Sequence, residues 1–241
     1  MHDWTKVDAG TYHMMHGAWL YAIADVLNTG LLPPAYYAMT ERRVAGLEAD
    51  VLTLRAGGPP AAPAAGGPAE PAVAVLERAD KSARPADRRV VVRQADGHDA
   101  VAVIKLVSPG NTKGREEYAA FVGKAADLLA AGVHVALIDP FRPPRHAPAG
   151  LHAAVWRKVT RVRKGRPPFS PAADRPLVAA SYCASYSLVT AAVQPFAVGE
   201  PVPDLPLYLT ADEHHVTLPL EATYMAAYPR IPQLRRDLLD R

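Results

Sequence analysis

The spacing of apolar residues predicts a helix followed by two strands in the first part of the chain. Residues 12–28 carry apolar side chains at roughly helical intervals, and the pattern stops at Gly30, which Pro33 and Pro34 follow. Residues 36–44 and 50–54 are rich in aromatic and β-branched side chains and flank Gly46, as expected for two strands joined by a turn.

The middle of the chain has the pattern of a hairpin, a helix and a further strand. Residues 88–94 and 100–107 flank an Asp96-Gly97 turn, which predicts a hairpin. Residues 113–131 form an apolar stripe of helical period that ends at Gly132, and residues 133–139 are a short apolar strand. A strand, helix and strand in this order imply a right-handed crossover. The first 140 residues are therefore expected to follow the order α-β-β-β-β-α-β.

The remainder is less regular. Residues 151–159 predict a short helix, 176–193 predict strands, and 217–241 end in a helical pattern, all expected to pack on the same core. Residues 57–71 are Gly, Pro or Ala at all but one position, a composition that cannot order itself by burying side chains. We expect a flexible surface insertion at about residues 57–85 within one domain spanning 1–241.

Composition sets broad limits on the class of protein. With 241 residues and 49% hydrophobic content the chain can bury a substantial core. Its single cysteine, Cys183, is expected to be a small buried residue and fits a reducing compartment. No signal-peptide pattern and no membrane-length apolar run is present, so the expectation is a cytoplasmic protein with no membrane partner. A net charge of +3 permits contact with nucleic acid without arguing for it.

Several residue clusters carry possible chemistry. His13 and His16 lie one helical turn apart and could share a metal ion, but the zinc-protease pattern is absent, so structural histidines are the better interpretation. Residues 212–215, Asp-Glu-His-His, lie between two apolar segments and are explained by a polar hairpin turn. The sequence contains no phosphate loop, Gly-x-Gly-x-x-Gly or nucleophile elbow, so kinase, dinucleotide-binding and serine hydrolase functions have no support.

A basic run near residue 160 is a candidate nucleic-acid contact. Six cations within ten residues could hold phosphates with a salt-dependent affinity, although a solvated loop or helix end explains the run equally well. The cations are Arg157, Lys158, Arg161, Arg163, Lys164 and Arg166.

Lys105 lies in the middle of the apolar segment VAVIKLVSP, residues 101–109. A buried charge costs several kcal/mol unless something pairs with it, so this lysine is expected to have a specific partner. Glu41 and Asp50 lie on the first two predicted strands, and Lys124 lies on the flank of the following helix. A metal-dependent phosphodiesterase needs carboxylates to hold Mg²⁺ and a lysine near the attacking water, and these residues supply such groups.

Several stretches resemble the bacterial family known as domain of unknown function 4058. They are residues 4–16, LNTGLLPPAYYA, ADVLTL, VAVIKLVSPGN, GVHVALIDPF and VTLPLEATYMAAY, and together they span nearly the whole chain. That family is similar to the restriction-endonuclease-like superfamily with its PD-(D/E)XK signature. The resemblance implies an α/β (α+β) protein with an αβββαβ core, a mixed central sheet and a β-rich, helical C-terminal extension.

The resemblance also assigns residues to a metal site. It implies that Asp50 is the aspartate of the signature, that Lys105 stands where the family has a glutamate, and that Lys124 is a lysine moved from position 107, where this chain has Val107. Glu41 matches a glutamate of the family to which the residues assign no role. An ammonium in place of a carboxylate changes the local charge by two units, so affinity for Mg²⁺ should fall steeply.

Two functions from different classes remain. The first is a nucleic-acid or protein binding module with a degenerate metal site, in which Lys105 pairs with Asp50 and Glu41. The alternative is an active Mg²⁺-dependent nuclease that uses Asp50 and Glu41 as ligands and Lys124 near the water. A third interpretation is a family activity other than phosphodiester cleavage, since a fold does not fix a function.

Overall fold

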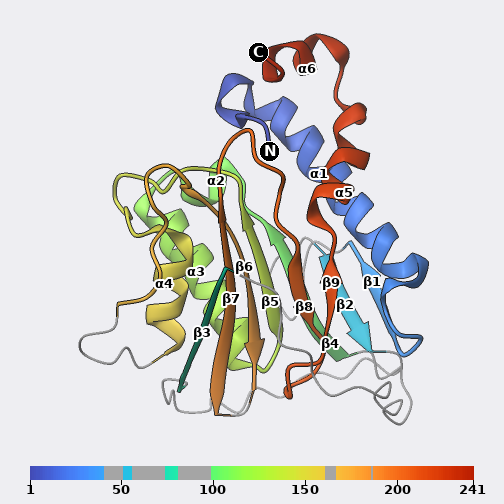
Figure 1. Ribbon diagram of the computed structural model, residues 1–241. Coiled ribbons are helices and arrows are strands. Elements are labelled where there is room, and N and C mark those ends of the chain that lie inside the picture. Colours follow the sequence, from blue (N-terminus) through green and yellow to red (C-terminus); the bar gives the residue numbers. More distant parts are fainter. Residues whose placement is uncertain (41–50, 56–73, 81–98, 161–166, 186) are drawn as a thin grey trace.

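The structure is a computed structural model that describes residues 1–40, 51–55, 74–80, 99–160, 167–185 and 187–241 (Figure 1). The strand expected over residues 88–94 lies outside these ranges. Glu41, Asp50, Arg161, Arg163, Lys164 and Arg166 lie outside them as well.

Within the described residues, seven strands form one mixed sheet in the order β1-β2-β4-β5-β6-β7-β3. The central neighbours β4 and β5 are parallel, and the other neighbouring strands are antiparallel. Two further strands, β8 and β9, form a separate antiparallel hairpin. The strands are β1 (Tyr36–Met39), β2 (Val51–Arg55), β3 (Val75–Asp80), β4 (Asp99–Leu106), β5 (His134–Asp139), β6 (Leu177–Ala184), β7 (Leu188–Phe196), β8 (Leu205–Tyr208) and β9 (His215–Leu218).

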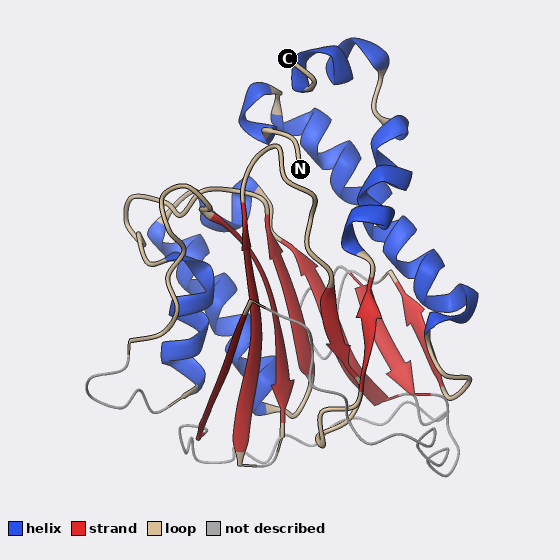
Figure 2. Cartoon of the chain, viewed as in Figure 1, coloured by secondary structure: helices blue, strands red, loops and turns tan. Residues whose placement is uncertain are grey.

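Helices and the β8/β9 hairpin cover the two faces of the sheet, which gives three layers (Figure 2). The first face is covered by α1, α5 and the hairpin, and the second by α3 and α4, each with its own cluster of buried apolar residues. The helices are α1 (Ala9–Val26), α2 (Pro109–Thr112), α3 (Arg115–Ala130), α4 (Gly150–Val159), α5 (Leu220–Ala227) and α6 (Gln233–Leu239), with short 3-10 turns at Trp4–Lys6 and Tyr228–Arg230 and a π turn at Leu27–Leu31.

The predicted first helix is confirmed as α1, which begins a few residues earlier than its apolar pattern. Asp8 caps it, because the Asp8 carboxylate accepts the backbone N–H and the side-chain hydroxyl of Thr11. After the π turn the chain bends at Gly30, whose φ of +114° favours glycine. The stop signal in the sequence therefore has a backbone cause.

The predicted strand, helix and strand over residues 100–139 are confirmed as β4, α3 and β5. β4 and β5 run parallel, with Ala102 beside His134 and Leu106 beside Ile138. Successive residues of β4 point to opposite faces, so that Ile104 joins the cluster under α1 and Val103 the cluster under α3. Burial on both faces explains why this strand is a continuous apolar run.

The expected insertion at 57–85 is wrong for part of its length. Val75–Asp80 forms β3, which pairs with β7 at the edge of the sheet, from Val75 beside Val193 to Asp80 beside Leu188. The pattern missed this strand because it carries polar side chains on both faces. Glu77 contacts His152 of α4, and Arg78 donates to Glu213 in the turn between β8 and β9.

The chain after Pro140 extends the same core, as expected. Its helix at 151–159 is confirmed as α4, and the strands expected over 176–193 are confirmed as β6 and β7, which lie beside β5. The polar turn expected at 212–215 joins β8 to β9. In the part of the chain that the structure describes, no helix has both the length and the apolar character needed to cross a membrane.

Candidate functional site at the carboxyl ends of the central strands

The parallel strands β4 and β5 end side by side near the centre of the sheet, where α/β proteins commonly bind ligands. The chain leaving β4 enters α2 through Ser108, and the chain leaving β5 turns at Pro140 into a long loop before α4. Side chains from α1, α3 and this loop meet the two strand ends. We take this region as the candidate functional site.

The SPGN segment after β4 has a local structural role. The side-chain oxygen of Asn111 accepts both the backbone N–H and the hydroxyl of Ser108, each at 2.9 Å, which closes a capping box at the start of α2. These two polar side chains therefore fix the direction in which the chain leaves β4.

Two side chains of α1 satisfy the last carbonyls of β4. The Tyr12 hydroxyl donates to the carbonyl of Val107 at 2.6 Å, and His16 Nε2 lies 3.1 Å from the carbonyl of Leu106. His13 is exposed and its ring stacks on that of His16, with 6.1 Å between centroids. The contact of His16 with the β4 carbonyl agrees with a structural role for that residue. Among the described residues, no group of three or more His, Cys, Asp or Glu side chains could hold a metal ion.

Lys105 lies on β4 beneath α3 and is half-buried. Its Nζ atom lies 5.6 Å from the centroid of the Phe121 ring, a cation–π distance. The neighbouring Ile104 pairs with Val51, the first residue of β2, and Asp50 precedes Val51 in the sequence. Because Asp50 and Glu41 lie outside the described residues, their pairing with Lys105 stays a prediction.

Asp139 ends β5 and is the buried carboxyl of this region, at 7% exposure. It accepts the backbone N–H of Phe141 at 3.2 Å, and burial raises the pKa of this carboxyl to about 7. Asp139 was not predicted as a site residue, because in the sequence it is only the last residue of a short apolar strand. The signal available was an acidic residue closing an apolar strand directly before a proline.

Two more polar groups accompany Asp139. The hydroxyl of Tyr118 on α3 and Nε2 of His146 are both buried, and neither has a hydrogen-bond partner among the described residues. Their rings meet edge to face with 5.4 Å between centroids. Burial, followed by the nearby Asp139 carboxyl, raises the pKa of Tyr118 to about 12. Polar groups that share a buried position are frequent at functional sites.

The described cations of the predicted nucleic-acid contact, Arg157 and Lys158, lie in the last turn of α4. Lys124 is exposed on α3, and Arg157 is exposed in the last turn of α4. Lys158 lies against the bare backbone of Gly123, with its Nζ 3.4 Å from the position a Cβ would occupy there. These cations therefore lie on two helices that pack against each other. Lys124 stands on the solvent side of α3, whereas Lys105 lies beneath that helix.

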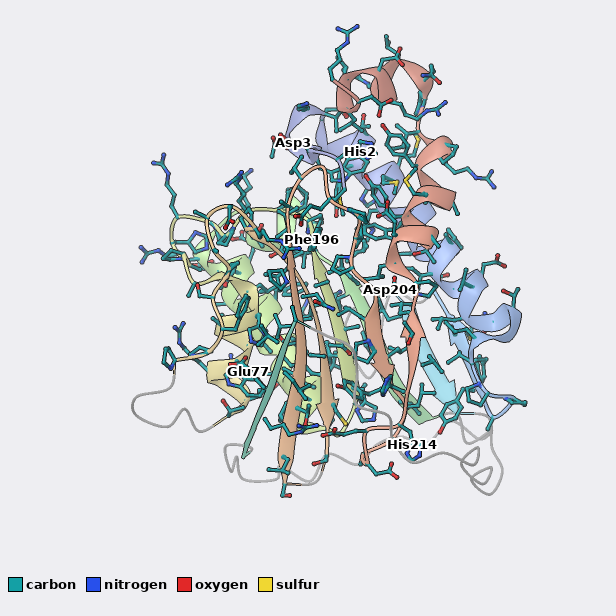
Figure 3. All side chains as sticks on the ribbon, viewed as in Figure 1. His2, Asp3, Glu77, Phe196, Asp204 and His214 are labelled. Carbon is teal, nitrogen blue, oxygen red and sulfur yellow. The ribbon has the colours of Figure 1, made fainter. Side chains whose placement is uncertain are left out.

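A buried hydrogen-bond network lies under α4, and no sequence pattern predicted it. His152 Nε2 is 2.6 Å from Glu77 of β3, and its Nδ1 is 2.8 Å from the Tyr182 hydroxyl of β6. Glu77, labelled in Figure 3, also accepts the backbone N–H of Phe169. These bonds tie β3 to the helix and to the sheet, and Tyr182 is fully buried, so the network has a structural role.

Comparison of the chain with models of protein families, with curated proteins and with solved structures gave no match in any of the three.

Proposed function

We propose that this chain is a nucleic-acid binding module built on a nuclease-like core whose metal site is degenerate. The observation that carries the proposal is the position of Lys105. Its ammonium is held beneath α3 against the Phe121 ring, at the point of the central strand where the family pattern has a carboxylate. A Lys105 side chain that pointed into solvent would not have supported a degenerate metal site.

The order of elements supports a nuclease-like core. With β3 and the short helix α2 set aside, the helices and strands of the described chain run α1, β1, β2, β4, α3, β5, which corresponds to the αβββαβ order that the resemblance implies. These four strands are adjacent in the sheet, and α1 and α3 cover opposite faces. This correspondence concerns the order of elements, and catalytic activity depends on the side chains of the site.

The described side chains of this region do not fit a Mg²⁺ site. Mg²⁺ prefers carboxylate and carbonyl oxygens, and the central strand presents the ammonium of Lys105 instead. Two like charges close together repel by several kcal/mol at the effective dielectric of a protein surface, roughly 4 kcal/mol at 4 Å for single charges. The function that we propose is therefore binding rather than metal-dependent cleavage.

The cations of α4, together with Lys124 on the neighbouring α3, support nucleic acid as the partner. Lys124, Arg157 and Lys158 come from two packed helices, and the last two begin a basic run that continues beyond the described residues. Cations attract phosphates, and each phosphate contact releases counterions.

Fluorescence anisotropy with labelled DNA and RNA oligonucleotides at several salt concentrations tests the proposal. Arg157→Ala with Lys158→Ala should weaken binding and reduce the slope of log affinity against log salt by about 1.8 on duplex DNA, since each phosphate contact contributes about 0.9. The matched control is Arg230→Ala with Arg241→Ala, which removes the same charge from the distant C-terminal part of the chain. Equal effects of the two pairs, or no binding by wild type, would exclude the proposed surface.

A second assay separates the binding module from an active nuclease. The wild type is expected to show no Mg²⁺- or Mn²⁺-dependent cleavage, whereas cleavage that disappears in Asp50→Ala would establish the alternative with Asp50, Glu41 and Lys124. Calorimetry with Mg²⁺ should detect no binding to wild type and new binding to Lys105→Glu. If Lys105→Glu binds no metal, the degenerate-site explanation for this lysine fails.

A further inference from the structure

A row of polar side chains crosses the sheet beneath the β8/β9 hairpin. Thr190 of β7 pairs with Cys183 of β6 on one side and with Arg78 of β3 on the other. Continuing the β5/β6 register by one residue sets His134 opposite Cys183, and the Ala184 N–H donates to Nδ1 of His134 at 3.0 Å. Paired residues point to the same face of a sheet, so four neighbouring strands contribute to one row.

The turn between β8 and β9 covers the thiol of Cys183, which is the single cysteine of the chain. The Sγ atom is 3.4 Å from the carbonyl oxygen of Thr210 and 4.0 Å from that of Ala211, and the side chain is 1% exposed. Carbonyl oxygens accept a hydrogen bond from a thiol and repel a thiolate. The covered state therefore keeps Cys183 protonated and unreactive.

The carboxylate of Glu213 connects this turn to the polar side chains of the sheet. Glu213 accepts the Thr190 hydroxyl at 2.6 Å and the Arg78 guanidinium at 2.9 Å. Glu213 also has a φ of +69°, a left-handed conformation that is unfavourable for a residue with a side chain. Contacts of the Glu213 side chain thus hold the turn against the sheet, at a φ that residues with a side chain rarely adopt. His214, labelled in Figure 3, belongs to the same turn.

Two hydroxyls beside Cys183 lack partners. Ser181 Oγ and Tyr208 Oη are both buried without a hydrogen bond among the described residues. Ser181 lies two residues before Cys183 on the same face of β6. The hydroxyl of Tyr208 interacts electrostatically with Glu213, Cys183 and Arg78. A buried hydroxyl without a partner is costly, so a molecule with hydrogen-bonding groups next to the thiol would satisfy both.

We infer that Cys183 is a modification site that takes small polar disulfides when the β8/β9 turn opens. After the Glu213 contacts break, the thiol gives its proton to solvent and the thiolate attacks one sulfur of the disulfide. The new sulfur–sulfur bond forms as the old one breaks, and the leaving thiolate takes up a proton. Cys183 is oxidised to the mixed disulfide, and the other half of the reagent is reduced to a thiol.

The rate of Cys183 modification by 2-hydroxyethyl disulfide, followed by mass spectrometry of the native protein, tests the role of the turn. Glu213→Ala should raise this rate at least about tenfold, because two charge-assisted hydrogen bonds no longer oppose opening. The matched control is Glu200→Ala, which removes a carboxylate that likewise has one arginine partner, Arg175, and one backbone N–H. Equal rates for the two variants, or modification only at the rate of global unfolding measured by tryptophan fluorescence, would overturn the inference.

A second comparison tests recognition by the hydroxyls. Ser181→Ala and Tyr208→Phe keep the thiol and its cover but remove the unpartnered groups. Each should slow modification by 2-hydroxyethyl disulfide several-fold relative to modification by the apolar reagent dimethyl disulfide. The ratio of the two rates cancels any general loosening of the fold, so a ratio that equals that of wild type would exclude a polar ligand at this site. Thr190→Val removes one of the two Glu213 contacts and leaves the Arg78 pair, so it should raise the rate less than Glu213→Ala does.

Discussion

Replacing Asp139 by asparagine should change how the stability of this protein depends on pH. Burial raises the pKa of the Asp139 carboxyl to about 7, from an ordinary value of 3.8. The folded protein therefore keeps this proton at pH values where the unfolded chain has lost it. The stability that the group contributes is fully present below about pH 3.8 and is lost as the pH rises through about 7.

The size of the effect follows from the two pKa values. A difference of about three units corresponds to ~4 kcal/mol, because one unit is worth about 1.4 kcal/mol. Between about pH 4 and pH 7, the unfolding free energy of wild type should fall by ~1.4 kcal/mol per pH unit relative to Asp139→Asn, and the difference should then level off. The amide oxygen can still accept the Phe141 N–H, so the comparison isolates the charge.

Urea unfolding of both proteins, followed by tryptophan fluorescence at pH values spanning about 4 to 8, measures this difference. Asp204→Asn is the matched control, because Asp204 is an exposed carboxyl in the loop between β7 and β8 (Figure 3). Its difference from wild type should not change over this range. A pH-independent difference for Asp139→Asn as well would show that Asp139 is ionised in the fold and would refute the argument.

Three substitutions test the contacts that hold the sheet and the site. Glu77→Leu should lower the unfolding free energy by about 2 kcal/mol in urea titrations, because the buried imidazole of His152 loses its carboxylate partner. Tyr12→Phe should cost about 1 kcal/mol by the same measurement, since the carbonyl of Val107 loses a hydrogen bond, and no change would show that water replaces the hydroxyl. Gly132→Ala should lower the melting temperature through a cost of about 1 kcal/mol, because the φ of +86° that ends α3 is strained for alanine.

The sequence pattern predicted the elements whose neighbours are close in the chain. α1, α3 and β5 were found because each has an apolar face or run that is buried within one layer, and this property is visible in a short window. β3 was missed because its polar residues find partners far away in the sequence. Glu77 and His152 are 75 positions apart, and Arg78 and Glu213 are 135 positions apart.

The candidate site shows the same division. Lys105 could be singled out, because a cation within an apolar strand is a local anomaly, and the structure places it beneath Phe121. For Asp139 the local pattern, an acidic residue before a proline at the end of an apolar strand, marks the position but does not reveal the burial that raises its pKa, because that burial depends on the packing of the whole fold. The unpaired groups of Tyr118 and His146 likewise depend on packing between elements.

The place of β3 at the far edge of the sheet constrains how the protein is made. Val75 of β3 pairs with Val193 of β7, so β3 leaves the ribosome long before its partner exists. At about 5–20 residues per second the wait lasts roughly 6 to 24 seconds, during which the strand has no sheet to join. Glu77 and Arg78 keep this segment polar through that interval. The polar side chains that hid the strand pattern of β3 in the sequence thus disfavour pairing of the nascent strand with another chain.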